Sequence, residues 1–104
     1  MVPSMRGIDH VHIYVESWSA VESWYASVLG FRRADAFLDW AVDGGPLTLT
    51  NSDGSVHLAL FEAANAKATS TIAFGANGAQ FLDWMQHLDA QGVEFRLADH
   101  DLSW

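Results

Sequence analysis

The sequence predicts an α+β fold in which a unit of one strand, one helix and further strands occurs twice, the second copy being incomplete. Residues 7–17 alternate in polarity as a strand does, and the residues after them have helical periodicity. Both patterns recur about 60 residues later, so that Trp24 falls on Trp84 and Gly30 on Gly92. We expect a single domain over residues 1–104, with module one at about 7–62 and module two at about 69–104.

Composition narrows the possible functions. Half of the 104 residues are hydrophobic and 17% are charged, as in ordinary globular domains. Five basic residues against thirteen acidic ones give a net charge of -8, which disfavours nucleic acid and anionic membranes as partners. The chain has no cysteine, which excludes disulfides and thiol nucleophiles, and we find no secretory signal or membrane span. A cytoplasmic protein is expected.

The first strand lies in "GIDHVHIYVES", residues 7–17. Side chains two residues apart in a strand share a face, so the segment presents two different surfaces. The aliphatic surface suits packing against a helix, whereas the polar-aromatic surface faces something else. The first holds Val11, Ile13 and Val15, and the second holds His10, His12 and Tyr14.

The helix follows in "SWSAVESWYASVLGF". Ser19 and Glu22 have the spacing of a capping box, and Gly30 is a typical helix stop. Apolar residues spaced by three and four positions form one face, which we expect to cover the aliphatic side of the strand. They are Val21, Trp24, Tyr25, Val28 and Leu29.

Three further strands are predicted at about 34–42, 47–51 and 56–61, separated by the turn signals "DGGP" and "NSDGS". The last two of these strands are predicted to pair as a hairpin. In the final strand His57, Ala59 and Phe61 share one face, which places His57 with the histidines of the first strand.

The second copy predicts a strand at 69–76, a helix at 77–91 that stops at Gly92, and a strand at 93–98. The chain then ends before two more strands. An incomplete sheet has an open edge and an exposed apolar face, both of which favour association. We expect a C-terminally truncated protein that forms a homodimer.

The motif "DHVHIYV" followed by "SAVESWYASVLGF" resembles the vicinal oxygen chelate superfamily, which includes glyoxalase I, bleomycin-resistance proteins and extradiol dioxygenases. The resemblance implies tandem βαβββ modules whose sheets curl into a cup. In the metalloenzymes of that family a divalent metal in the cup chelates neighbouring substrate oxygens, which is Lewis-acid catalysis.

Matched to that family, His10 falls on the first-strand metal ligand. Ala59 stands where an acidic ligand is found, and Thr71 or Ser70 stands where a second histidine is found. The closing strand with a final glutamate has no counterpart. One expectation is therefore that a divalent metal (Ni, Zn, Mn or Fe) binds at His10. The favoured expectation is that this chain alone binds no metal.

The leading hypothesis is a small-molecule site in the cup, which in an enzyme would serve a metal-dependent lyase, isomerase or dioxygenase. Its catalytic residues are not assigned. The alternative is a metal-free, drug-sequestering binder of the bleomycin-resistance type, and a third is a module with only an assembly role. The residues expected to contact the ligand are His12, Tyr14, Trp40, His57 and Phe61.

Overall fold

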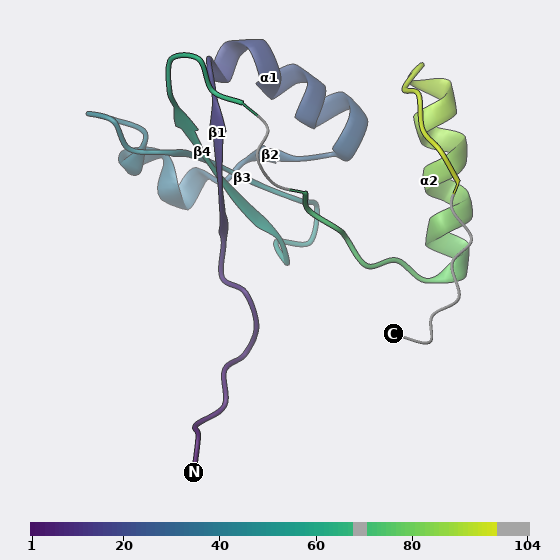
Figure 1. Ribbon diagram of the computed structural model, residues 1–104, viewed down its shortest axis with the longest axis horizontal. Coiled ribbons are helices and arrows are strands. Elements are labelled where there is room, and N and C mark those ends of the chain that lie inside the picture. Colours follow the sequence, from purple (N-terminus) through teal and green to yellow (C-terminus); the bar gives the residue numbers. More distant parts are fainter. Residues whose placement is uncertain (68–70, 98–104) are drawn as a thin grey trace. The chain divides into compact units, whose positions relative to one another are not determined.

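The computed structural model describes residues 1–67 and 71–97, and it divides into two compact units, Met1–Thr71 and Ile72–Trp104 (Figure 1). Unit 1 contains a four-stranded mixed sheet with helices, which confirms the predicted α+β class. Within the described ranges no helix has both the length and the apolar character needed to cross a bilayer. Whether the two units form one domain stays a prediction.

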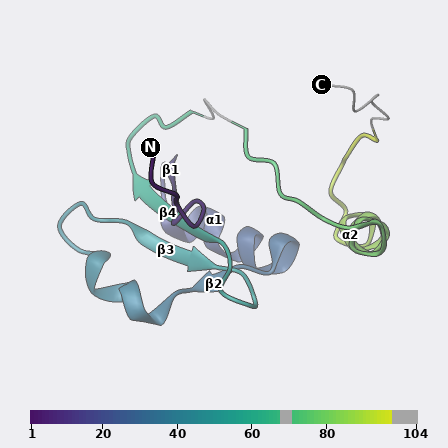
Figure 2. The same cartoon turned by 90° about the horizontal axis from the view of Figure 1, so that it is seen from below.

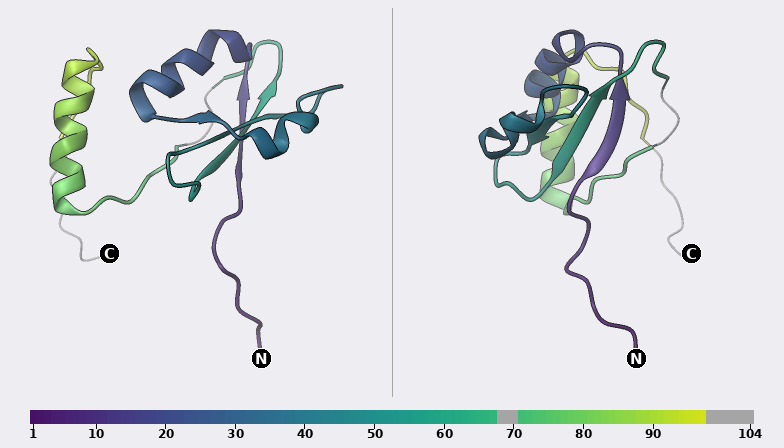
Figure 3. Two further views of the ribbon diagram at one scale, coloured as in Figure 1. Left: turned by 180° about the vertical axis from the view of Figure 1, so that it is seen from behind. Right: turned by 90° about the vertical axis from the view of Figure 1, so that its left-hand side faces the viewer.

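Unit 1 follows the order strand, helix, then three strands, which is one βαβββ module. Its sheet has the strand order β1-β4-β3-β2, with β1 parallel to β4 and the other neighbours antiparallel (Figure 3). The predicted hairpin of β3 and β4 is confirmed. The elements are β1 Val11–Val15, α1 Trp18–Trp24, the π-helix η1 Tyr25–Leu29, β2 Arg32–Arg33, the 3₁₀-helix η2 Asp35–Trp40, β3 Leu47–Thr50 and β4 His57–Glu62.

The core lies on one face of this sheet. Alternation along β3 and β4 puts four leucines on that face, and each is at most 2% exposed. Val28 of η1 and Phe31 after it are buried as well. Figure 2 shows α1 and η1 on one side of the sheet and η2 on the other, so the helix covers the leucine face. The leucines are Leu47, Leu49, Leu58 and Leu60.

The first helix ends as predicted and begins differently. Gly30 has φ 73°, a left-handed conformation that favours glycine, and it terminates η1. The predicted capping box of Ser19 and Glu22 is wrong. The N-cap is Ser17, whose side chain makes no capping bond, and the Glu22 carboxylate instead accepts two hydrogen bonds from Arg33 of β2 at 2.5 and 2.9 Å. A bidentate guanidinium is the stronger partner for this carboxylate.

The N-terminus of α1 is hydrogen-bonded to the C-terminal end of β4. Glu62 Oε2 accepts a hydrogen bond from the backbone N–H of Trp18 at 3.0 Å, and the Trp18 indole N–H donates to the Leu60 carbonyl at 2.7 Å. A carboxylate at a helix N-terminus satisfies an unpaired N–H and also complements the helix dipole. The helix is thereby tied to the central strand of the sheet.

The strand predicted at 34–42 is wrong. The ladder stops where Ala34 donates to the Thr48 carbonyl at 2.9 Å, and the backbone then turns into η2, with Phe37 donating to the Ala34 carbonyl at 2.9 Å. Residues three apart eclipse in a 3₁₀-helix, and the Phe37 and Trp40 rings pack in a tilted arrangement with centroids 4.9 Å apart. Packing of these two rings replaces the cross-strand pairing that the prediction assumed.

Unit 2 contains the predicted helix as α2, Gly78–Ala90. Its capping box is complete, since Asn77 Oδ1 accepts from the Gln80 N–H at 2.8 Å and Gln80 Oε1 accepts from the Asn77 N–H at 2.9 Å. The strands predicted at 69–76 and 93–98 are absent from 71–76 and 93–97, and their remaining residues lie outside the described ranges. No residue between 71 and 97 is buried, and this described part of the unit contains no strand with which the two segments could pair.

Candidate functional site

The face of the sheet opposite the core carries the predicted histidines, and we call it the histidine face. The register pairs His12 with Ala59, and Ala59 with Thr48 on its other side. Paired residues point to the same side of a sheet. Tyr14 and Phe61 follow two positions along on the same face, and Thr50 pairs with His57.

A cavity of about 250 Å³ opens on this face below η2. Three of the residues expected to form the site lie together in it: His10, Trp40 and His57. Trp40 reaches it from a helix and not from a strand. The full lining is Asp9, His10, Phe37, Trp40, Pro46, Thr48, His57 and Ala59.

Three aromatic rings form a continuous wall of the cavity. The Phe37 ring packs against Trp40 with the ring planes tilted by 34°. It meets His57 edge to face, with these two centroids 5.9 Å apart. Such edge-to-face contacts fix the relative orientation of the rings. The wall therefore joins η2 to β4, and it presents ring faces and edges toward the cavity.

Two other lining residues, Asp9 and His10, belong to a hydrogen-bonded chain of three side chains that ends at His12. Asp9 Oδ2 is 2.8 Å from His10 Nδ1, and His10 Nε2 is 3.0 Å from His12 Nε2. The hydrogen bond from His10 holds the pKa of the Asp9 carboxyl below its usual value. Since the Asp9 carboxylate is an acceptor, His10 donates to it from Nδ1. In the second contact either Nε2 atom can be the donor.

The other residues expected at the site lie on the histidine face but outside the cavity lining. His12, Tyr14 and Phe61 form a row of rings, with the Phe61 centroid 4.8 Å from His12 and 5.6 Å from Tyr14. Whether they contact a ligand stays a prediction.

Sequence reasoning missed five lining residues, one of which, Ala59, it had placed on the correct face without assigning it a contact. Thr48 could have been found, because it alternates with the leucines of β3. Phe37 was missed because the sequence pattern of its segment is that of a strand, and neither Asp9 nor Pro46 carries a local signal of its role.

The side chains here do not complete a metal site. A transition metal needs about three convergent ligands, and across residues 1–67 and 71–97 no group of three or more histidine, aspartate or glutamate side chains is arranged to hold one. His10 and His12 provide two imidazoles. Glu62 caps α1, Ala59 has no donor, and Ser70 lies outside the described residues. His10 as a ligand stays a prediction.

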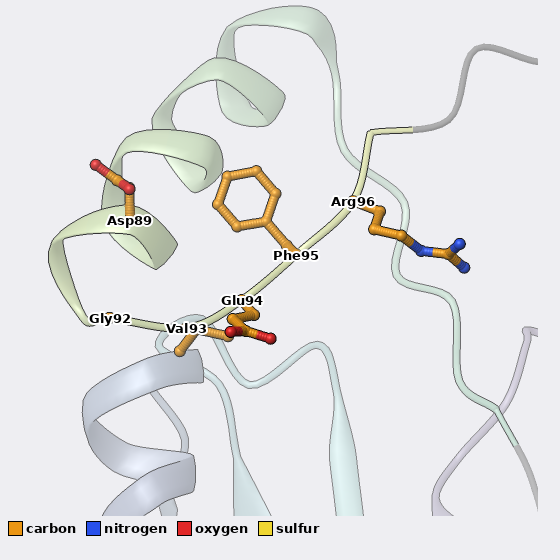
Figure 4. Close-up of a pocket in the computed structure, with 6 residues that line it drawn as sticks. All are labelled: Asp89, Gly92, Val93, Glu94, Phe95 and Arg96. Carbon is orange, nitrogen blue, oxygen red and sulfur yellow. The ribbon is translucent and has the colours of Figure 1, made fainter.

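A second, wider hollow of about 830 Å³ lies in unit 2, where the chain turns back after α2. Figure 4 shows the Phe95 ring turned toward the helix, whereas the Asp89 carboxylate and the Arg96 guanidinium point away from each other. Polar groups that point away from each other cannot orient one ligand. This hollow is therefore a weaker candidate for a ligand site than the cavity lined by Phe37, Trp40 and His57.

Comparison with known families agrees with the fold. The family model for the Glyoxalase/Bleomycin resistance protein/Dioxygenase superfamily matches residues 7–101. No match was found among curated proteins or among solved structures.

Proposed function

Because the chain belongs to the Glyoxalase/Bleomycin resistance protein/Dioxygenase superfamily, we propose that it binds a small organic ligand in the aromatic cavity of unit 1, with no metal held by the protein. The observation that carries the proposal is the wall of Trp40, Phe37 and His57, which lines the same cavity as the hydrogen-bonded pair Asp9 and His10. A mostly apolar lining with a few polar groups is the usual composition of a small-molecule site.

The donor set supports binding without a metal. Both ring nitrogens of His10 already have partners within 3.0 Å. The carboxylate nearest to a family ligand position, Glu62, is engaged with the N–H of Trp18. A metal would have to displace the contact between His10 and His12, and residues 1–67 and 71–97 would not supply it with a third convergent ligand.

A second candidate is the metal-dependent lyase or dioxygenase of the same superfamily, with His10 as a ligand. One observation favours it. The Nε2 atoms of His10 and His12 converge, and Asp9 holds the other nitrogen of His10, as carboxylates commonly do behind metal-binding imidazoles. The two candidates differ in whether the purified protein takes up metal.

The proposed function is tested by titrating the protein with a panel of one-ring, two-ring and aliphatic compounds while following the tryptophan indole N–H resonances. We expect the binding compounds to shift the Trp40 resonance, and Trp40→Ala to abolish binding. Trp24→Ala is the matched control, because Trp24 is also partly exposed but does not line the cavity. An equal loss of binding in both variants would refute the assignment of the cavity.

The metal question is settled separately by elemental analysis and titration with Zn²⁺ and Ni²⁺. We expect no stoichiometric uptake, and equal behaviour of the wild type and His10→Ala. Tight one-to-one binding that disappears in His10→Ala would favour the enzyme and overturn the metal-free proposal.

A further inference from the structure

The size of the cavity limits its occupant. Drug-sized ligands occupy pockets of roughly 300 to 1,000 Å³, whereas an apolar cavity of about 150 Å³ accommodates a benzene ring. At about 250 Å³ the cavity on the histidine face is smaller than a pocket for a drug-sized ligand and larger than a cavity for benzene alone. It fits one ring with a short polar substituent, and it is too small to enclose a glycopeptide.

The wall also has an electronic preference. Trp40 is 57% exposed, so part of its indole surface is open to a ligand although Phe37 packs against it. Indole is the strongest of the aromatic side chains in attracting a cation to its face. A cationic ligand gains from this wall more than a neutral one of the same shape.

The charged group at the cavity has the complementary sign. Asp9 is an acceptor whose Oδ2 is bound to His10, which leaves the second carboxylate oxygen for a donor on a ligand. None of the eight lining residues is a lysine or arginine. His10 acts most strongly on the Asp9 carboxylate, followed by His57 and then by the exposed Arg6, so a ligand cation competes with these groups for it. The net charge of -8 further concentrates cations near the protein.

We propose that the ligand is a single aromatic ring that carries a positively charged nitrogen on a short arm. The ring packs against Trp40 and Phe37, and the ammonium group reaches Asp9. This inference rests on the proposed function, and it names the chemical class of the ligand for that same site.

Three probes with the same ring test it: 2-phenylethylamine is cationic, 2-phenylethanol is neutral and phenylacetate is anionic. Each is titrated into the full chain at pH 7 and low salt, with the Trp40 indole resonance and calorimetry as readouts. We expect the amine to bind at least about fivefold more tightly than the alcohol, which is the effect of one charge pair about 4 Å apart in water. The acid should bind most weakly, and added salt should reduce the preference.

Asp9→Asn should weaken binding of the amine about fivefold and leave the alcohol within about twofold. Asp39→Asn is the matched control, since it removes the same charge from an exposed residue of η2 that does not line the cavity. Equal effects of the two variants would attribute the preference to net charge and overturn the role of Asp9.

The outcomes separate the inference from the proposed function. If the alcohol or the acid binds as tightly as the amine and still shifts Trp40, the cavity is a binding site but its ligand is not cationic. If only larger compounds of the panel shift Trp40, the one-ring class is wrong and the binding function stands. If no compound shifts Trp40, both fail. A preference for the amine that is lost in Asp9→Asn alone supports both.

Discussion

Leu60 is the residue at which the stability of unit 1 can be tested most directly. It lies in the central strand β4, paired with Ile13 of β1 on one side and Leu47 of β3 on the other, and it is 0% exposed. Leu60→Ala removes three buried carbon atoms. At about 0.8 kcal/mol for each buried CH₂ group, the transfer cost alone is about 2.4 kcal/mol.

The cavity left behind adds to this cost, because both neighbouring strands hold the backbone in place. Buried leucine-to-alanine changes cost about 3 to 5 kcal/mol in total. A unit of this size has a free energy of unfolding of only about 4 to 10 kcal/mol. We therefore expect Leu60→Ala to remove a third or more of the stability and to lower ligand affinity, because its neighbour Ala59 lines the cavity.

Leu38→Ala is the matched control, since Leu38 lies in η2 and is 37% exposed. It should cost no more than about 1 kcal/mol. Urea unfolding followed by circular dichroism at 222 nm measures both variants. Equal midpoints for the two would refute the reasoning, because they would mean that β4 is not the centre of the core.

Three other predictions concern named contacts. Arg33 lowers the pKa of Glu22, so this exposed ion pair adds a small contribution to stability above pH 4.5, the ordinary pKa of Glu22, and that contribution is lost as pH falls through the lowered value. Glu22→Gln should therefore flatten the acid limb of a plot of stability against pH, and an unchanged limb would argue against the pair. Trp18→Phe leaves the Leu60 carbonyl without its indole donor, and thermal unfolding should show a loss of about 1 kcal/mol. Asn77→Ala removes the cap of α2 and should lower its stability by about 1 kcal/mol, seen as reduced helical circular dichroism, whereas Asn77→Asp should retain it.

Local patterns in the sequence by themselves determine much of the fold. Alternation in 56–61 and the turn residues before it specify the hairpin of β3 and β4, because a period of two and a short turn are encoded by neighbouring residues. Gly30 and Gly92 mark the ends of both long helices, since glycine adopts the left-handed conformation at low cost. The same alternation places His10 and His57 at one site.

Only the tertiary structure decides which residues complete that site. Phe37 and Trp40 reach the cavity because the backbone leaves the sheet after Ala34 and forms η2, where packing between rings outweighs strand propensity. Glu62 gains its role from a helix that begins 44 residues earlier in the chain. Sequence pattern reports the face on which a side chain lies, whereas the partners it meets depend on the register between distant segments.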